Sequence, residues 1–248
     1  MEQTLRLDKY LADLGKGTRS QIRDMVRGGR VKVNGETAKK PEQKVKVPGD
    51  SVTLDGMPVA YVEMEYYLLN KPAGTVSATE DKRYPTVVSL IKDRNRRDLF
   101  PVGRLDLDTE GLLLITNDGD LAHRLLSPKR HVDKVYFARC QGMLLPGAEA
   151  MFKAGISLSD GLTCLPAKLE RLREYREEDG ERVSAVTEVL LTIREGKFHQ
   201  VKRMMEAVGC PVLYLKRLSM GPLQLDETLK PGEYRALTTE ELERIKKL

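Results

Sequence analysis

The chain has 248 residues, of which 40% are hydrophobic, 32% are charged and only 5% are aromatic, with no tryptophan. This length allows one large domain or two unequal domains with a mainly aliphatic core, and the apolar periodic segments along the chain exclude a disordered protein. The net charge of +5 is concentrated near the N-terminus, because residues 1–60 hold 12 Lys and Arg against 8 Asp and Glu. A basic N-terminal quarter indicates a polyanionic partner.

The cysteines and histidines indicate a reducing compartment and no metal site. The cysteines are far apart and form no two-cysteine motif, so we expect free buried thiols in a soluble, cytoplasmic protein. The histidines do not lie at zinc-ligand spacing from them. The N-terminus has no long apolar run, which predicts neither a signal peptide nor a membrane span. These residues are Cys140, Cys164, Cys210, His123, His131 and His199.

Two short helices and two basic strands are predicted in the first quarter of the chain. Apolar residues recur at helical spacing over residues 5–14. A second helix begins at Thr18, where Gln21 is positioned to complete a capping box. Apolar and basic residues alternate at 31–33 and 44–47, which predicts short strands with outward lysines.

The second helix carries a stripe of arginines at one-turn spacing, Arg19, Arg23 and Arg27, and Arg30 follows it. The residues alone allow two interpretations. The charges can simply solubilise a small domain, or the guanidinium groups can contact consecutive phosphates of a nucleic acid. The helix pair and the basic hairpin, over about residues 4–55, resemble the αL-type RNA-binding domain of the ribosomal-protein-S4 type. This resemblance implies that residues 1–58 bind RNA.

The rest of the chain, residues 59–248, is predicted to form a second domain of the α+β class after a junction at residues 55–65. Strand patterns outnumber helical patterns and do not alternate with them, which favours a mostly antiparallel mixed sheet flanked by helices. We expect strands at 66–70, 112–115, 135–140, 185–193 and 212–218, helices at 120–126, at 197–208 and at the C-terminus, a surface helix with a loop at 82–98, and an exposed charged connection at 170–182.

The segment 103–119 places three acids in a short polar loop directly before a buried strand. Catalytic groups are often carried by loops that a rigid scaffold positions, so Asp106 is the candidate nucleophile, with Asp108 and Glu110 as competitors. Other interpretations remain open from the residues alone: surface acids, a magnesium site, or part of a paired-acid glycoside hydrolase. Nucleotide-dependent phosphoryl transfer lacks its usual glycine-rich loop.

Two further segments carry candidate site residues. Residues 194–205 place five basic residues and a glycine at a predicted strand-to-helix turn. Because Lys202 and Arg203 lie next to the apolar helix face, one of them is predicted to point inward, pair with Asp106 and hold it ionised. Tyr136 lies in a predicted strand, where it is either a core residue or a flat ring for stacking a base, with a hydroxyl for proton transfer.

These segments resemble the three motifs of the RsuA family of pseudouridine synthases. The resemblance rests on Gly-Arg-Leu-Asp with its Thr-Asn-Asp-Gly tail, on Lys-Val-Tyr, and on Glu-Gly-Lys-Phe-His-Gln-Val-Lys-Arg-Met, and it spans nearly the whole chain. It implies an isomerase that converts a uridine of 16S (small-subunit) ribosomal RNA to pseudouridine, without a cofactor. It also implies Asp106 as the nucleophile, Tyr136 as the residue that stacks under the base and relays a proton, and Lys202 as the basic partner of Asp106.

The same resemblance implies that Arg104 fills the space left by the extruded nucleotide, which agrees with the need to flip a base out of its stack before chemistry on it. Arg203 is the second choice for the basic partner and a candidate for RNA binding. The expected partner is small-subunit ribosomal RNA or its assembly intermediate, and the protein is expected to be a monomer. Two alternatives stay open: an enzyme for 23S (large-subunit) ribosomal RNA, and a non-catalytic RNA-binding assembly factor.

Overall fold

The protein is described from a computed structural model, in which residues 3–179 and 182–248 are described. The chain forms two compact units. The N-terminal unit holds the residues up to Glu65 together with Lys92–Leu99, and the second unit holds Tyr66–Ile91 together with Phe100–Leu248. The chain thus enters the second unit, returns to the first for a short stretch, and leaves again. The assignment of RNA binding to residues 1–58 and of catalysis to residues 59–248 stays a prediction.

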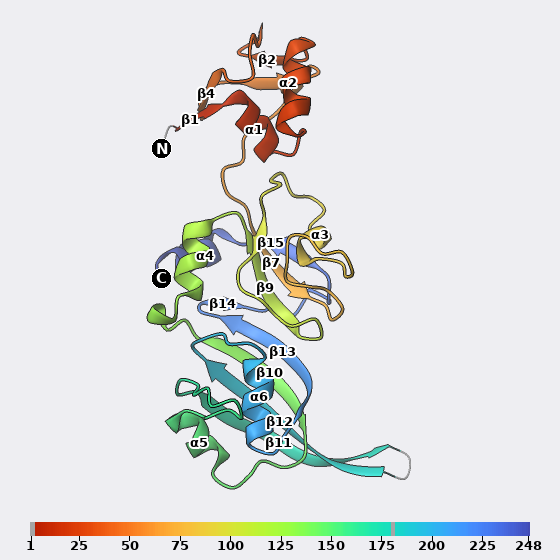
Figure 1. Ribbon diagram of the computed structural model, residues 1–248, viewed down its shortest axis with the longest axis vertical. Coiled ribbons are helices and arrows are strands. Elements are labelled where there is room, and N and C mark those ends of the chain that lie inside the picture. Colours follow the sequence, from red (N-terminus) through yellow and green to blue (C-terminus); the bar gives the residue numbers. More distant parts are fainter. Residues whose placement is uncertain (1–2, 180–181) are drawn as a thin grey trace. The chain divides into compact units, whose positions relative to one another are not determined.

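Two helices and two small sheets make up the N-terminal unit (Figure 1). In α2 (Arg19–Arg27), the Thr18 hydroxyl accepts a hydrogen bond from the Gln21 backbone at 3.3 Å, and the Thr18 backbone donates to the Gln21 side chain at 2.8 Å. The predicted capping box is therefore confirmed. α1 (Leu7–Asp13) begins later than predicted, because β1 (Gln3–Arg6) is extended and pairs with β4 (Lys44–Val47).

The other sheet of this unit has the order β3-β2-β5-β6. The core of the N-terminal unit is mainly aliphatic, as the composition predicted, and Leu11, Ile22 and Val31 are fully buried in it. The strands are β2 (Val31–Val33), β3 (Glu36–Thr37), β5 (Val52–Leu54) and β6 (Met57–Pro58).

The returning segment, Lys92–Leu99, is fixed to the N-terminal unit by a buried arginine. The Arg96 guanidinium donates to Asp98 at 2.5 and 2.8 Å and to the Tyr61 hydroxyl at 2.7 Å. The Arg97 backbone donates to the Asp13 carbonyl at 3.0 Å. For residues 82–98 we predicted a surface helix with a loop. The structure has a short helix there, α3 (Val87–Leu90), whose two valines are buried, and an irregular loop after it that these tertiary bonds fix.

Among the described residues, nine strands form the sheet of the second unit, in the order β11-β12-β10-β13-β9-β7-β15, with β14 beside β13 and β8 beside β9. Of the strand pairs described in this sheet, β9 with β13 is parallel and the others are antiparallel, so the α+β prediction with a mostly antiparallel mixed sheet is confirmed. The strands are β7 (Tyr66–Lys71), β8 (Phe100–Pro101), β9 (Glu110–Thr116), β10 (Lys134–Gln141), β11 (Lys168–Asp179), β12 (Arg182–Ile193), β13 (Val212–Met220), β14 (Leu223–Gln224) and β15 (Tyr234–Ala236).

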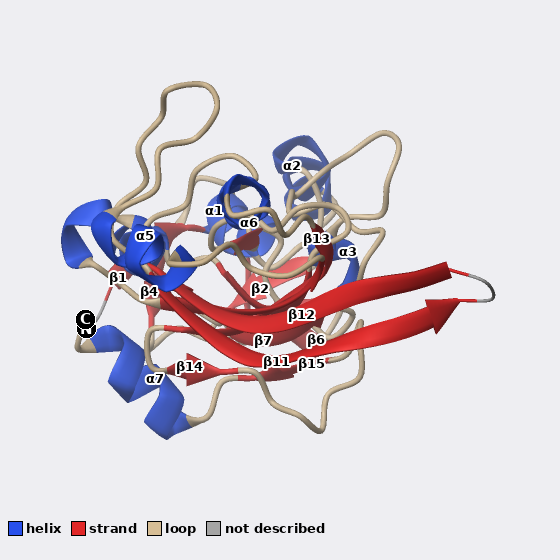
Figure 2. Ribbon diagram, turned by 90° about the horizontal axis from the view of Figure 1, so that it is seen from below, coloured by secondary structure: helices blue, strands red, loops and turns tan. Residues whose placement is uncertain are grey.

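The charged stretch 170–182, expected to be an exposed connection, is instead mostly strand. β11 pairs with β12 in a long antiparallel hairpin that extends past the other strands (Figures 1 and 2). Side chains of β11 form ion pairs with neighbouring strands. The Arg173 guanidinium lies 2.7 Å from Glu188 of β12, and Glu177 pairs with Arg139 of β10. Cross-strand ion pairs replace the apolar alternation by which a strand is usually recognised. Residues 180 and 181 lie outside the described residues.

Helices cover both faces of the large sheet. α4 (Gly119–Leu126) and α7 (Thr239–Lys246) bury the face that carries Leu68, Leu112 and Leu114. α5 (Ala148–Ala154) and α6 (Gln200–Ala207) lie together on one side of the strands β11 and β12 (Figure 2). A short 3₁₀-helix, η1 (Pro128–Arg130), follows α4. None of the helices in the described part of the chain is both long and apolar enough to cross a membrane.

Candidate active site

The loop that carries Asp106 is held by its backbone. The loop runs from β8 to β9. Three residues earlier in the chain bind it: Gly74 and Ser77, which follow β7, and Lys71 at the end of β7. The Gly74 backbone donates to the Leu107 carbonyl at 2.8 Å. The Ser77 hydroxyl and the Leu105 backbone are hydrogen-bonded at 3.0 Å. Because these bonds involve the backbone on both sides of Asp106, they fix its position without using its carboxylate.

The third tie is Lys71, at the end of β7, whose side chain is 0% exposed. Its ammonium donates to the carbonyls of Thr109 at 2.8 Å, Pro72 at 3.1 Å and Leu107 at 3.4 Å. Burial lowers the pKa of Lys71 to about 8, although the nearby acids of the loop act in the opposite direction. The ammonium is therefore still charged at neutral pH. It lies at the end of β7 and binds the backbone of the loop that carries Asp106.

Asp106 lies beside the cation that the sequence predicted. Its carboxylate is 27% exposed, and the Lys202 ammonium, 26% exposed, lies 3.4 Å from its Oδ2 atom. His199 Nε2 lies 3.7 Å from the other oxygen. The Lys202 ammonium makes shorter bonds to Asp108, at 2.6 and 2.8 Å. One lysine of α6 thus stands between two carboxylates of the same loop.

Asp108 is the more exposed of the two acids, with 71% of its side chain accessible to solvent. Partial burial acts to raise the pKa of Asp108, but the hydrogen bonds and the charge of Lys202 outweigh it, and the net shift is downward. Asp108 is therefore ionised at neutral pH and holds the lysine in place next to Asp106.

α6 is positioned by the turn that precedes it. The buried Gln200 side chain accepts from the Lys197 backbone at 2.9 Å and donates to Glu195 at 2.8 Å. His199, the N-cap of α6, has a left-handed backbone with φ of 49°. The apolar face of α6 (Val201, Met204, Met205) is buried, so Lys202 projects from its side toward the loop. The turn and the helix together define where Lys202 and His199 stand.

Tyr136 belongs to a row of residues that crosses the sheet. In the strand register, Tyr136 of β10 is opposite Arg217 of β13, Arg217 is opposite Gly111 of β9, and Gly111 is opposite Lys71 of β7. Residues that are opposite each other share a sheet face. Tyr136, Arg217 and Lys71 therefore project from the same face, with the Asp106 loop at the start of β9.

Gly111 makes this row possible. A Cβ atom at Gly111 would lie 2.2 Å from the Arg217 carbonyl, and its φ of +101° is one that other residues rarely adopt. The Arg217 guanidinium is buried and donates to the Leu112 carbonyl at 2.8 Å, while its Nη2 atom has no hydrogen-bond partner among the described residues. The acids of the neighbouring loop act electrostatically on Lys71 in the same row, and Arg217 acts on Lys71 in the opposite direction.

Within the described residues, neither Arg203 nor Arg104 pairs with Asp106. Arg203, adjacent to Lys202, turns to Asp160 at 2.5 Å. Arg104 is exposed, and within the described residues it has no ion-pair partner. Lys202 rather than Arg203 is thus the cation beside the candidate nucleophile.

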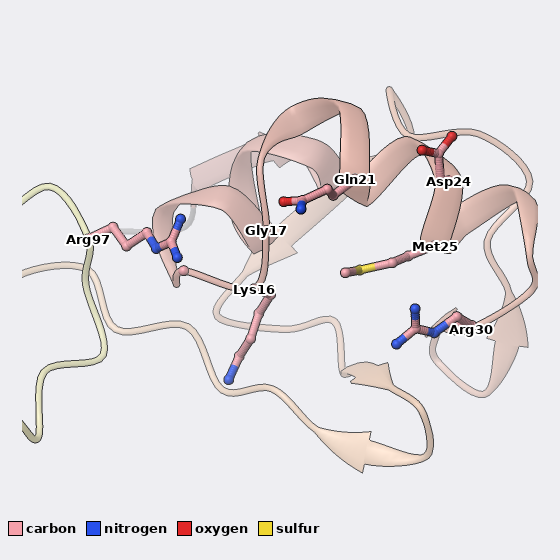
Figure 3. A pocket seen from close by; sticks show the side chains of 8 residues that line it. Lys16, Gly17, Gln21, Asp24, Met25, Arg30 and Arg97 are labelled. Carbon is pink, nitrogen blue, oxygen red and sulfur yellow. The ribbon is translucent and has the colours of Figure 1, made fainter.

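In the N-terminal unit, the three arginines that we call the α2 arginine stripe, Arg19, Arg23 and Arg27, are exposed on α2. Arg30 pairs with Asp55 at 2.6 and 2.7 Å and lines a shallow cavity of about 510 Å³. Figure 3 shows Lys16 and Arg97 at the same cavity, over the turn between α1 and α2. Cations from α2, from the turn before it and from the returning segment therefore gather in this unit.

Sequence reasoning missed Lys71, Arg217 and the placement of His199. A lysine at the end of an apolar run (Tyr66–Lys71) and an arginine inside another (Val212–Met220) are signals of buried charge. His199 was counted among the basic residues of 194–205 and rejected as a metal ligand, but its place beside Asp106 was not predicted. Among the described residues, no three His, Cys, Asp or Glu side chains are grouped so that they could hold a metal ion.

The exposed arginines of the N-terminal unit agree with a polyanionic partner such as nucleic acid, and the contact between Asp106 and Lys202 is the candidate site of chemistry. The chain belongs to the RNA pseudouridylate synthase family, which it matches over residues 65–207, and residues 5–52 match the S4 domain. It is therefore an RNA pseudouridine synthase, an isomerase.

Similar proteins cover nearly the whole chain. An uncharacterized RNA pseudouridine synthase of Bacillus subtilis is 47% identical over 96% of this chain and 97% of its own length. A ribosomal small subunit pseudouridine synthase A of Vibrio parahaemolyticus is 41% identical over 97% of this chain and 99% of its own. A crystal structure of a pseudouridylate synthase is 38% identical, with a TM-score of 0.65 over 97% of this chain and 99% of that one.

Proposed function

We propose that this enzyme isomerises a specific uridine of small-subunit ribosomal RNA, with Asp106 as the nucleophile. Support for the substrate comes from relatives named ribosomal small subunit pseudouridine synthase A, which are 38–41% identical over nearly the whole chain. The observation that carries the chemistry is the Asp106 carboxylate, half-buried on a loop tied at three points, with the Lys202 ammonium 3.4 Å away.

The reaction needs no redox partner and no group donor, because substrate and product are isomers. In the proposed sequence, Asp106 attacks the ribose of the target uridine and the glycosidic bond breaks. The detached uracil turns, and its carbon 5 forms the new bond to the sugar, which releases Asp106. The proton on carbon 5 then leaves, and the Tyr136 hydroxyl is the proposed relay for it.

Each neighbouring residue has a role that follows from its place. The Lys202 ammonium, 3.4 Å from Asp106, balances the negative charge of its carboxylate. Tyr136 offers its ring to the uracil from the sheet face that also carries Lys71 and Arg217. Arg104, exposed and without an ion-pair partner in the described part of the chain, fills the gap that base flipping leaves.

The N-terminal unit supplies affinity and register through phosphate contacts, which carry most of the sequence-independent affinity for RNA. The proposed contacts are the α2 arginine stripe and Arg30, and in the second unit Arg203. The substrate is the RNA or a partly assembled subunit, and we propose that the enzyme acts as a monomer in the cytoplasm.

The test is tritium release from RNA labelled at carbon 5 of uridine, measured on small-subunit and large-subunit transcripts. Asp106→Asn is expected to abolish release and to leave RNA affinity within about a few fold, because phosphate contacts outside the site supply that affinity. Asp120→Asn, at an exposed acid in the first turn of α4, is the matched control and should behave as wild type.

Release from the small-subunit transcript alone supports the proposal. Release from the large-subunit transcript alone would assign the enzyme to that RNA instead. Retained release by Asp106→Asn would remove Asp106 from its role. If wild type releases no tritium from either transcript or from partly assembled subunits, the proposed function fails.

A further inference from the structure

Phe198 is exposed next to the candidate active site. Its side chain is 75% exposed, more than any other large hydrophobic side chain in the described residues. Scattered exposed apolar residues are common and need no explanation by themselves. The surroundings of Phe198 are what distinguish it.

The ring of Phe198 is stacked on the imidazole of His199, with the ring centroids 3.8 Å apart and the planes at 19°. The edge of that imidazole faces the site, because His199 Nε2 lies 3.7 Å from the Asp106 carboxylate. One face of Phe198 is therefore covered by a ring of the site, and most of its remaining surface is open to solvent.

The backbone under this pair is rigid. The buried Gln200 side chain spans the turn, through its bonds to the Lys197 backbone and to Glu195. The Lys197 ammonium donates to the Thr163 carbonyl at 2.6 Å, which fixes the turn to a second segment. These bonds hold the backbone of the turn, and the stacking on His199 orients the ring of Phe198, which together lower the entropic cost of binding to it.

We propose that Phe198, supported by His199, is a stacking platform for a nucleobase of the RNA, from a nucleotide that flanks the target uridine. Aromatic rings that stack on splayed bases are a general mode of single-stranded RNA recognition, because every base has a π face. The target uridine itself is not the proposed occupant, because its ribose must lie at Asp106, which is at the edge of the imidazole, whereas Phe198 is stacked on the face of that ring. The inference rests on the proposed function, since it requires an RNA at Asp106.

The absence of tryptophan from the chain allows a direct test. In the Asp106→Asn background, which prevents turnover, Phe198→Trp introduces a single indole at the platform. Binding of the small-subunit transcript should quench its fluorescence strongly, because a stacked base quenches indole emission. The matched control is Met143→Trp in the same background. Met143 is 61% exposed and lies beyond the far end of β10 from Lys134, so its emission should hardly change.

A kinetic measurement with full-length enzyme complements this test. Phe198→Leu keeps an apolar side chain but removes the ring, and should lower kcat/KM by about 5- to 30-fold, mainly through KM, as expected for one lost base–aromatic stack. Phe198→Tyr keeps the ring and should restore activity to within about twofold of wild type, because a phenol also stacks. Equal melting temperatures of the variants would exclude a folding defect.

Unchanged kcat/KM in Phe198→Leu, or indole emission that RNA leaves unaltered while binding is confirmed by filter retention, would overturn the platform. These outcomes are separate from failure of the proposed function. If wild type isomerises no ribosomal RNA uridine, the function fails whatever the fluorescence shows. If wild type is active and Phe198→Leu is equally active, only the platform fails.

Discussion

Lys71→Met removes the buried ammonium that ties the Asp106 loop to β7, and keeps most of the length of the side chain. The carbonyls of Pro72, Leu107 and Thr109 then lose a donor. Burying the charged lysine is itself unfavourable, as the fall of its pKa from 10.5 to about 8 records. The two effects oppose each other, and pH changes their balance.

The magnitude follows from the pKa of Lys71. A shift from 10.5 to about 8 corresponds to about 3 kcal/mol of unfavourable burial while the amine is charged. At neutral pH this cost largely offsets the bonds to the carbonyls, of which the short one to Thr109 contributes about 1.5–3 kcal/mol. Below pH 8 the amine is charged both folded and unfolded, and the full cost applies. Above 10.5 it is neutral in both, and the cost is gone.

Between these limits the unfolded chain binds more protons than the folded one, so the free energy of unfolding rises with pH. We therefore expect Lys71→Met to change the free energy of unfolding little at neutral pH. The advantage of wild type over the variant should grow by about 3 kcal/mol toward pH 10.5.

Urea unfolding followed by circular dichroism, at about pH 7.5, 9 and 10, measures this difference, and subtracting the variant cancels the other groups that titrate in this range. A difference that stays flat with pH would show that Lys71 is not desolvated. A difference that shrinks would contradict the sign of the pKa shift. Because the loop carries Asp106, the variant should also release tritium more slowly at neutral pH even where its stability is intact.

Three further predictions concern the site and the RNA-binding surface. Gly111→Ala should lower the free energy of unfolding, measured in urea, by at least about 2 kcal/mol, because Gly111 has a φ of +101° and the new Cβ atom would lie 2.2 Å from the Arg217 carbonyl. The control Gly119→Ala, which has open space around it in α4, should be neutral or stabilising. Asp108→Asn should change kcat/KM at most about fivefold, since an exposed ion pair contributes little; a loss as large as that of Asp106→Asn would make Asp108 the essential acid. Replacing the α2 arginine stripe with glutamine should reduce the slope of log affinity against log salt by about 2, and an unchanged slope would show that these arginines do not touch RNA.

Features set by local sequence were predictable, and features set by distant contacts were not. The Thr18 capping box needs only neighbouring residues, and it was predicted correctly. The charged stretch 170–182 was predicted to be an exposed connection because it is highly charged, whereas pairing with β12 makes most of it a strand. The return of Lys92–Leu99 to the N-terminal unit depends on the burial of Arg96 against Tyr61 and Asp98, which no local pattern reports.

The candidate site divides in the same way. Lys202 was expected near Asp106 because a half-buried carboxylate needs a cation, and the resemblance to known motifs singled out both residues; the structure places them 3.4 Å apart. The sequence did not predict that Lys71 and Arg217 lie at the site, because their positions depend on how β7, β9 and β13 pair around Gly111. The roles in catalysis and RNA binding stay predictions, since proximity does not establish them.

The distances around Lys202 bear on how Asp106 can serve as a nucleophile. The short bonds of the Lys202 ammonium go to Asp108, at 2.6 and 2.8 Å, whereas Asp106 lies at 3.4 Å from Lys202 and 3.7 Å from His199. Charge–charge attraction persists at these longer distances, but hydrogen bonding weakens. The Lys202 ammonium therefore balances the charge of Asp106, while within the described part of the chain no short hydrogen bond occupies the oxygens of that carboxylate. Because the loop is held through backbone carbonyls and amides, the carboxylate is positioned without using its own oxygens, which suits the attacking role proposed for it.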